Sequence, residues 1–233
     1  MSELAMESGG SLVQRAVQAV RDYIRQHDLK VGDTLPAEGQ FSAELGVSRA
    51  VMREAFGALA ALKLIDVGNG RRAKVAPMDG SVLAASLDHG VATAQISVPE
   101  IWDVRRTVEL RIAELAAERR TEKQAEAIVG HAEAMAASLD DMAAMTEHDI
   151  ALHQTIAEAA NNMLFLQMIR SFEPLMQVAV PEAWRTRVST EQKQSIIALH
   201  RRLAAAIRDR DAAGSRAAVD AHFDSSIGRM LER

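Results

Sequence analysis

Cysteine is absent from this chain of 233 residues. Its absence excludes disulfide bonds, thiolate metal ligands and redox sensing through a thiol. Aromatic residues are also scarce, at 3%, although hydrophobic residues of all kinds make up 48%. Such a composition, with alanine throughout, favours closely packed helices over strands. We therefore expect a mostly helical protein.

Long hydrophobic runs are missing too. No stretch approaches the roughly 18 uninterrupted apolar residues of a membrane span, and residues 1–10 lack the basic start and apolar run of a signal peptide. We interpret residues 1–10 as a flexible tail and expect a cytoplasmic protein without a membrane partner. The length allows two domains, and the break at residues 77–80 places them at residues 11–77 and 78–233.

Residues 35–75 have the pattern of a helix, a tight turn, a second helix and a basic hairpin. Residues 35–38, Leu-Pro-Ala-Glu, suit the start of the first helix, because proline and a carboxylate are both favoured there. Ser48 can cap the second helix. Arg49 and Arg53 follow four residues apart and therefore lie on one face. This order of elements predicts a winged helix-turn-helix.

The second helix has an apolar face opposite its arginines, and the hairpin has a polar turn. Val51, Ala55, Leu59 and Leu62 recur at helical spacing. Two short β-prone pieces enclose the turn, which carries Asn69, Gly70, Arg71 and Arg72. Ahead of the motif, residues 12–26 predict an amphipathic helix capped by Ser11 that braces it. The sequence thus predicts a small helical core with an arginine-tipped wing.

Charge is concentrated in this motif, although the whole chain is acidic. Residues 45–77 hold six Lys or Arg against two acids, a net +4, and the chain total of −5 leaves −9 for the rest. One confined docking surface for double-stranded DNA is indicated, rather than general affinity for nucleic acids. The alternative is that the arginines form an ordinary solvated helix face. The joint occurrence of cap, turn, basic helix and basic wing favours DNA binding.

Over about residues 12–77 the chain resembles the DNA-binding domain of GntR-type bacterial transcription regulators. The motifs that carry the resemblance are Leu35-Pro36-Ala37-Glu38, Leu45-Gly46-Val47-Ser48-Arg49, Arg53-Glu54-Ala55, Leu59 and Leu62. The resemblance implies that Ser48, Arg49 and Arg53 contact operator DNA and that Gly70 enters the minor groove. The family often has an arginine just after its Pro-Ser-Glu motif, where this chain has Gly39. The operator sequence is therefore not carried over.

Residues 78–233 are a succession of helical patterns with short breaks, without an internal repeat. They predict an all-α antiparallel bundle. Capping boxes fit Thr121 with Gln124 and Ser189 with Gln192, and Asn161 with Asn162 offers a left-handed stop. The expected helices cover residues 82–94, 100–120, 121–139, 141–160, 163–180, 189–210 and 211–232, with a loop at residues 181–188.

Three of these helices carry possible metal ligands. Asp149 and His153 are one helical turn apart and share a face. His200 and His222 each lie beside the apolar stripe of their own helix. One carboxylate and three imidazoles suit Zn²⁺, or another borderline divalent ion such as Mn²⁺ or Ni²⁺. Spacing alone leaves open that each histidine is an ordinary packing residue.

Residues 82–230 resemble the FCD ligand-binding domain of the FadR subfamily of GntR regulators. The motifs are Arg105 with Glu109, Asp149 to His153, Asn162, His200, and Ala221 with His222. The resemblance implies a metal ion held by Asp149, His153, His200 and His222. It also implies an effector site at Arg105 and Asn162, with Arg105 gripping the effector carboxylate as a bidentate pair. In the alternative, Arg105 forms a surface ion pair with Glu109, and Arg106 takes its role.

We therefore expect a homodimeric, metabolite-responsive transcription regulator. Two winged helices would contact the half-sites of a palindromic operator, and a small carboxylate-bearing metabolite, an organic or sugar acid, would relieve repression. Two alternatives remain. An Asp/His₃ metal site with open positions also suits a metal-dependent enzyme acting on small organic acids, and the bundle of an architectural DNA-binding dimer would bind no effector.

Overall fold

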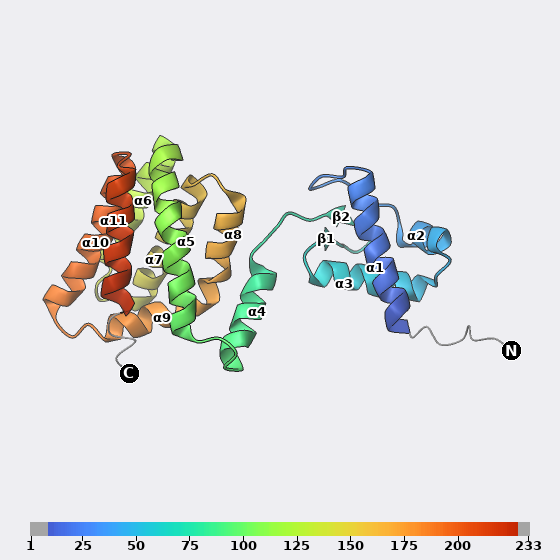
Figure 1. The fold of residues 1–233 in the computed structure, drawn as a ribbon, viewed down its shortest axis with the longest axis horizontal. Coiled ribbons are helices and arrows are strands. Elements are labelled where there is room, and N and C mark those ends of the chain that lie inside the picture. Colours follow the sequence, from blue (N-terminus) through green and yellow to red (C-terminus); the bar gives the residue numbers. More distant parts are fainter. Residues whose placement is uncertain (1–8, 228–233) are drawn as a thin grey trace. The chain divides into compact units, whose positions relative to one another are not determined.

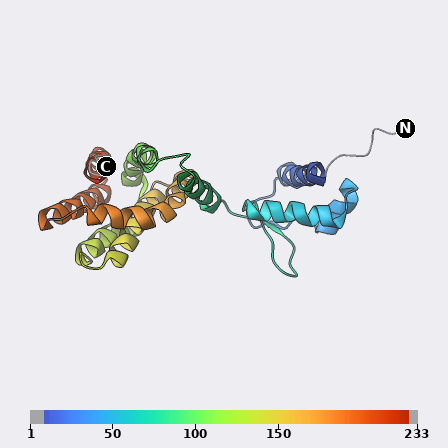
Figure 2. The same cartoon turned by 90° about the horizontal axis from the view of Figure 1, so that it is seen from below.

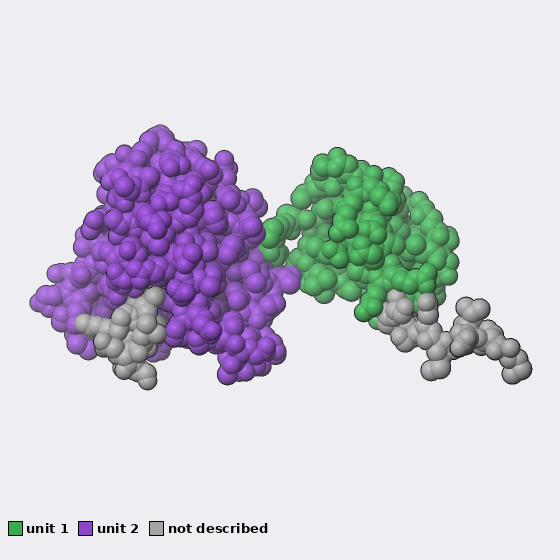
Figure 3. Space-filling model, viewed as in Figure 1, with its two compact units in different colours: residues 1–79 green, residues 80–233 purple. Residues whose placement is uncertain are grey.

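A computed structural model gives the structure of the chain and describes residues 9–227. The chain divides into two compact units, residues 1–79 and residues 80–233 (Figure 3). The described part contains eleven helices and one two-stranded sheet (Figure 1). The predicted fold class, mostly α with a winged helix-turn-helix ahead of a helical bundle, is confirmed. No described helix is long and apolar enough to cross a membrane.

The first unit packs three helices and a short hairpin around its own core. Its elements are α1 (Gly9–Gln26), α2 (Glu38–Leu45), α3 (Arg49–Ala61), β1 (Ile65–Asp66) and β2 (Lys74–Val75). The strands pair antiparallel. Helix α1 begins inside the predicted tail, so the prediction that Ser11 caps it is wrong; glycine accepts helical dihedral angles, and the helix runs back through Gly10 to Gly9. Residues 1–8 of the predicted tail lie outside the described residues.

Local sequence signals build the turn between α2 and α3. Gly46 adopts a left-handed φ of 64°, which glycine accepts without steric penalty. The Ser48 side chain accepts a hydrogen bond from the Val51 N–H at 3.2 Å, as expected of an N-cap. The predicted apolar face of α3 is partly wrong, because the helix ends at Ala61 and Leu62 is 51% exposed. The buried face consists of Met52, Ala55, Phe56 and Leu59.

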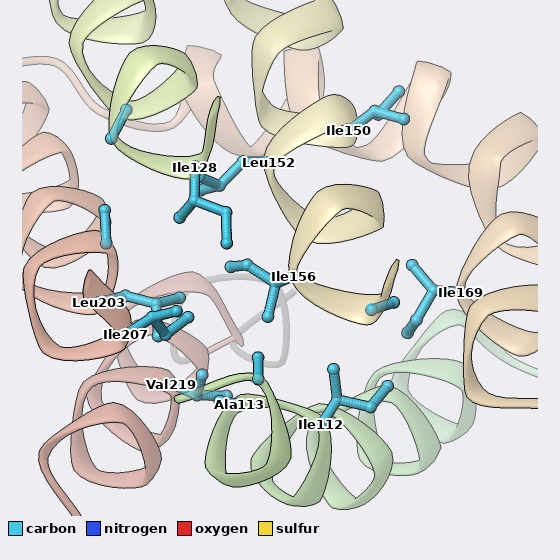
Figure 4. Packing of buried hydrophobic residues seen from close by; sticks show 14 of the residues in the cluster. Ile112, Ala113, Ile128, Ile150, Leu152, Ile156, Ile169, Leu203, Ile207 and Val219 are labelled. Atoms are coloured by element: carbon cyan, nitrogen blue, oxygen red, sulfur yellow. The ribbon is translucent and has the colours of Figure 1, made fainter. Parts of the chain in front are cut away.

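The second unit is an all-α bundle. Its helices are α4 (Ser81–Ala92), α5 (Val98–Arg119), α6 (Glu122–Ala137), α7 (Met142–Ala159), α8 (Met163–Ser171), α9 (Glu173–Arg185), α10 (Thr190–Arg208) and α11 (Ala212–Ile227). Helix α11 packs against α5 and α10, and α6 packs against α7 and α10. Aliphatic side chains from these five helices meet in one core (Figure 4). Because alanines interleave with the larger side chains, the helices pack closely.

Two helix boundaries in the bundle differ from the prediction. The segment predicted as one helix at residues 163–180 is two helices, α8 and α9, because Pro174 lies in the first turn of α9, a position that starts a helix. The loop predicted at residues 181–188 is helical as far as Arg185. Pro181 lies inside α9, where it removes a backbone donor without ending the helix. The final predicted helix is described to Ile227, and its remainder to residue 232 lies outside the described residues.

The predicted caps of the bundle helices form. Thr121 with Gln124 and Ser189 with Gln192 both make complete capping boxes. Asn161 takes a left-handed φ of 49° directly after α7, as the sequence indicated. These signals fix where α6 and α10 begin and where α7 ends.

Candidate functional site

The arginines of α3 and of the wing share one solvent-open groove. Arg49 and Arg53 are exposed, and together with Arg71 and Arg72 they line a groove of about 560 Å³. None of these four forms an ion pair with any described residue. Since no carboxylate neutralises them, the groove presents positive charge of the kind that attracts phosphates, with guanidiniums able to reach base edges.

The wing tip is a tight turn. The Arg71 N–H donates to the Gly68 carbonyl at 3.1 Å, and Gly70 has a left-handed φ of 69°. The hairpin projects away from the helices of its unit (Figure 2). Gly70 lines the groove, whereas Ser48 and Asn69 are exposed beside it without lining it. The structure therefore brings five of the seven predicted DNA-contacting residues to one surface and places the other two at its border.

Three histidines meet inside the bundle, from α7, α10 and α11. Ligand-competent ring nitrogens of His153, His200 and His222 lie within 4.8 Å of one another, and each side chain is at most 9% exposed. Asp149 joins them, with Oδ1 3.2 Å from His200 Nε2. Helical spacing places Asp149 and His153 on one face of α7, and the packing of α10 and α11 brings the other two rings to it.

Hydrogen bonds fix the proton position on two of the rings. His153 Nδ1 donates to Glu109 Oε2 at 2.5 Å, and His200 Nδ1 donates to the Ile196 carbonyl at 2.9 Å. In their neutral forms both rings therefore carry the lone pair on Nε2. Both Nε2 atoms, and Nδ1 of His222, are buried without a hydrogen-bond partner. Buried polar atoms normally have a partner, so these three nitrogens are available to a ligand.

The donor set fits a divalent metal ion. His200 Nε2 lies 3.2 Å from Asp149 Oδ1 without good hydrogen-bond geometry, and two lone pairs at that distance repel unless a metal ion or a proton lies between them. Imidazole nitrogen and carboxylate oxygen are ligands of Zn²⁺, Mn²⁺ and Ni²⁺. Four protein ligands leave up to two positions open on a six-coordinate ion.

The pKa shifts of the two carboxylates and of His222 suit metal binding, whereas Glu109 raises the pKa of His153 against the effect of burial, so a metal ion must compete with a proton there. Burial alone would raise the pKa of Glu109, but Arg105 and His153 lower it to about 2. Burial would also raise the pKa of Asp149, and the neighbouring imidazoles hold it well below its usual range. Burial and the other two rings lower the pKa of His222 well below its usual value. At neutral pH the carboxylates are therefore charged and His222 is neutral, which are the protonation states that metal binding requires.

Arg105 lies beside the cluster and is ion-paired to Glu109. Its Nε and Nη2 atoms are 2.8 and 2.7 Å from Glu109 Oε1, and Nη1 contacts Met176 Sδ. The ion pair considered as an alternative is present, but it is buried rather than at the surface, with both residues at most 5% exposed. Arg106 pairs with two aspartates of α11 instead and does not line the cavity at the cluster.

A small cavity adjoins the histidines. Its volume is about 40 Å³, enough for an ion or a single water molecule but too small for a whole sugar acid. The walls include Arg105 and three residues that the sequence analysis missed, Trp102, Trp184 and Arg187. Trp102 lies on α5, Trp184 on α9 and Arg187 just after α9, so their position depends on how these two helices pack, which no local pattern reveals. A larger ligand therefore requires neighbouring side chains to move.

Asn162 lies apart from the cavity. It is exposed, and its side chain accepts hydrogen bonds from the Leu164 and Phe165 N–H groups as the N-cap of α8. The predicted effector role does not agree with this position. An asparagine at a helix start is accounted for by capping alone.

A winged helix-turn-helix with an arginine-lined groove that no carboxylate neutralises, followed by an all-α bundle with buried histidines, defines a class of DNA-binding regulators. Residues 12–75 match the family described as bacterial regulatory proteins, gntR family, and residues 100–225 match the FCD domain. The chain belongs to the GntR family, in the group that carries an FCD domain. It is a transcription regulator and not an enzyme.

Named relatives agree with this assignment. The galactonate operon transcriptional repressor of Escherichia coli K12 is 30% identical over 207 residues, covering 86% of this chain and 89% of the relative. The HTH-type transcriptional repressor NanR of Salmonella newport is 27% identical, covering 92% and 83%. Among solved structures, Streptococcus agalactiae GntR shares the fold with a TM-score of 0.64 at 20% identity, covering 91% of this chain and 98% of that one.

Proposed function

We propose that this regulator is a metabolite-responsive repressor that binds palindromic operator DNA as a homodimer. Two copies related by two-fold symmetry would present two winged helices to two half-sites. Arg49 and Arg53 would enter the major groove, and the wing around Gly70 would lie against the minor groove. The four arginines without a carboxylate partner support this arrangement, as do relatives named repressors.

The bundle senses its effector at a divalent metal ion held by Asp149, His153, His200 and His222. The observation that carries this proposal is the set of three buried imidazole nitrogens without hydrogen-bond partners beside a buried carboxylate. Zn²⁺ is the first candidate, because imidazole and carboxylate ligands suit it. Mn²⁺ and Ni²⁺ are the alternatives.

The effector is an organic or sugar acid. Open positions on the metal would accept its carboxylate and a neighbouring hydroxyl, with Arg105 in the cavity wall supplying positive charge. One relative is named for the galactonate operon, and galactonate is a sugar acid with a hydroxyl next to its carboxylate. Binding here would favour one arrangement of the two winged helices and release the operator, to the extent that the effector binds that state better.

Metal analysis of purified full-length protein tests the site. We expect bound divalent metal in the wild type and loss of most of it in His200→Ala. His131→Ala is the matched control, because His131 is a half-buried histidine of the same bundle that contacts another imidazole, His148, and not the cluster. Full occupancy in His200→Ala would remove His200 as a ligand, and equal loss in both variants would point to general unfolding.

A screen of sugar acids and other hydroxy acids tests the effector. A ligand that binds only the folded state raises the melting temperature. We expect a rise for at least one acid in the presence of metal and none after chelation. That acid should also release a palindromic site selected from random DNA. If no acid changes either the melting temperature or DNA binding, the bundle is not a carboxylate sensor.

A further inference from the structure

Glu109 is a buried acid to which the sequence assigned no role of its own. Its two carboxylate oxygens have different partners from different helices. Oε1 binds Arg105, one turn earlier on α5, and Oε2 accepts the Nδ1–H of His153 on α7. Glu109 is 4% exposed, so water does not share these contacts. One side chain thus joins the cavity arginine to a cavity histidine.

We propose that Glu109 is a positioning residue that fixes His153 as a metal ligand and holds Arg105 in the wall of the same cavity. The inference rests on the proposed function, and it assigns one side chain that connects the metal site with the effector site. Carboxylates that accept the second ring N–H of a ligating histidine orient the ring and raise its basicity. Glu109 places the proton on Nδ1, which leaves Nε2 of His153 directed to the other two rings.

The same contact sets how Arg105 meets an effector. Its Nε and Nη2 atoms are already 2.8 and 2.7 Å from one Glu109 oxygen, and Nη1 contacts Met176. An incoming carboxylate therefore cannot form a bidentate pair with the Nε and Nη2 side of Arg105 in this conformation. It either contacts a remaining N–H group or displaces Glu109, and displacement would also loosen His153. Effector binding and metal binding are thereby coupled through Glu109.

Zinc affinity of the full-length protein, measured by competition with a chromophoric chelator, tests the proposal. Glu109→Gln keeps the shape of the side chain but loses the charge. We expect it to weaken Zn²⁺ binding by about 10- to 100-fold, the range found when a histidine ligand loses its outer partner. Glu114→Gln is the control, since Glu114 lies on the same helix and pairs with Arg111 and Arg216 away from the cavity. It should bind Zn²⁺ as the wild type does.

Glu109→Gln leaves Arg105 buried without its partner and can unfold the bundle. The comparison is therefore repeated between Arg105→Leu and the double variant Arg105→Leu/Glu109→Gln, which contains no unpaired buried guanidinium. The double variant should bind Zn²⁺ about 10- to 100-fold more weakly than Arg105→Leu. At saturating Co²⁺, its visible absorption bands should also shift relative to those of Arg105→Leu, because the ring of His153 is no longer held. General loosening of the fold would not move these bands at saturation.

The outcomes separate this inference from the proposed function. If the wild type binds no divalent metal, both are overturned. If the wild type binds Zn²⁺ and the double variant binds it as tightly as Arg105→Leu, with the same Co²⁺ spectrum, the metal site stands and the role of Glu109 is overturned. A loss of affinity confined to the variants that lack the Glu109 carboxylate supports the role.

Discussion

Two pairs of residues one helical turn apart behave in opposite ways in the two units. Arg49 and Arg53 carry like charges, yet both are exposed and lack an ion-pair partner among the described residues. Arg105 and Glu109 carry opposite charges and are buried together. Water and salt screen the first pair, whereas the second pair must satisfy itself inside the protein. The same spacing therefore gives a charged surface that a binding partner can reach in the first unit, and a buried ion pair in the second.

The largest difference between the pairs should appear in stability. We expect Arg105→Ala to destabilise the bundle by about 3–5 kcal/mol, because it leaves Glu109 buried without its main counter-charge. Urea unfolding followed by tryptophan fluorescence measures this, since the chain has two tryptophans, Trp102 and Trp184, and both lie in the bundle. Arg106→Ala, which removes partly exposed ion pairs, should change stability by no more than about 1 kcal/mol. Equal unfolding midpoints for the two variants would refute the contrast.

Removing the proposed metal ion should affect one unit only. A ligand at about 100 times its Kd stabilises the folded state by about 2.7 kcal/mol, so chelation should lower the stability of the bundle by about that amount. Hydrogen exchange should show lost protection in α7, α10 and α11, which carry Asp149 and the three histidines, and unchanged protection in α1 to α3. A loss of protection spread over both units would contradict a metal site confined to the bundle.

Sequence patterns predicted what depends on neighbours along the chain. The cap at Ser48, the capping box at Thr121 and the left-handed Asn161 are local signals, and all three form. Pro181 was misleading because it lies inside α9 and does not end the helix. The proposed role of Glu109 required knowing that α5 packs against α7, because the sequence offered Glu109 only as a surface ion-pair partner of Arg105.

The candidate site, too, could be predicted from the sequence only in part. Helical spacing placed Asp149 with His153, and the apolar stripes together with the resemblance indicated His200 and His222, which the structure brings to the same place. Neither gave the distances between these groups or the small volume of the cavity, because both depend on how the helices pack. Asn162 matched a motif but lies elsewhere as a cap. A motif thus identifies residue types, and packing determines which of them share a cavity.

In the DNA-binding unit the expected effects fall on binding. Arg49→Ala should weaken binding to a selected palindromic site by about 1–3 kcal/mol and relax sequence preference there. Stability should change by less than about 0.5 kcal/mol, because the side chain is exposed and unpaired. Fluorescence anisotropy with labelled DNA measures the affinity. Arg21→Ala, at an exposed arginine on α1 away from the groove, is the control. Equal loss in both variants would mean that Arg49 contributes only general charge.

The smallest expected effect is tighter DNA binding after substitution of Gly39. Gly39 lies near the start of α2 and lines the same groove as Arg49 and Arg53, and a Cβ added there would meet no atom within 4 Å. Gly39→Arg should therefore fit and add one contact to phosphate. We expect tighter binding by less than tenfold, under about 1.4 kcal/mol, with a steeper salt dependence by about one unit of slope.

Gly39→Gln separates charge from helix propensity at this position. Arginine and glutamine both favour a helix more than glycine does, by up to about 1 kcal/mol, but only arginine adds a counterion to be released from DNA. The glutamine variant should therefore keep the salt slope of the wild type while sharing any gain in stability. If both variants bind DNA equally well and with the same salt dependence, position 39 does not face the phosphate backbone. The positively charged groove then extends no further than Arg49 and Arg53.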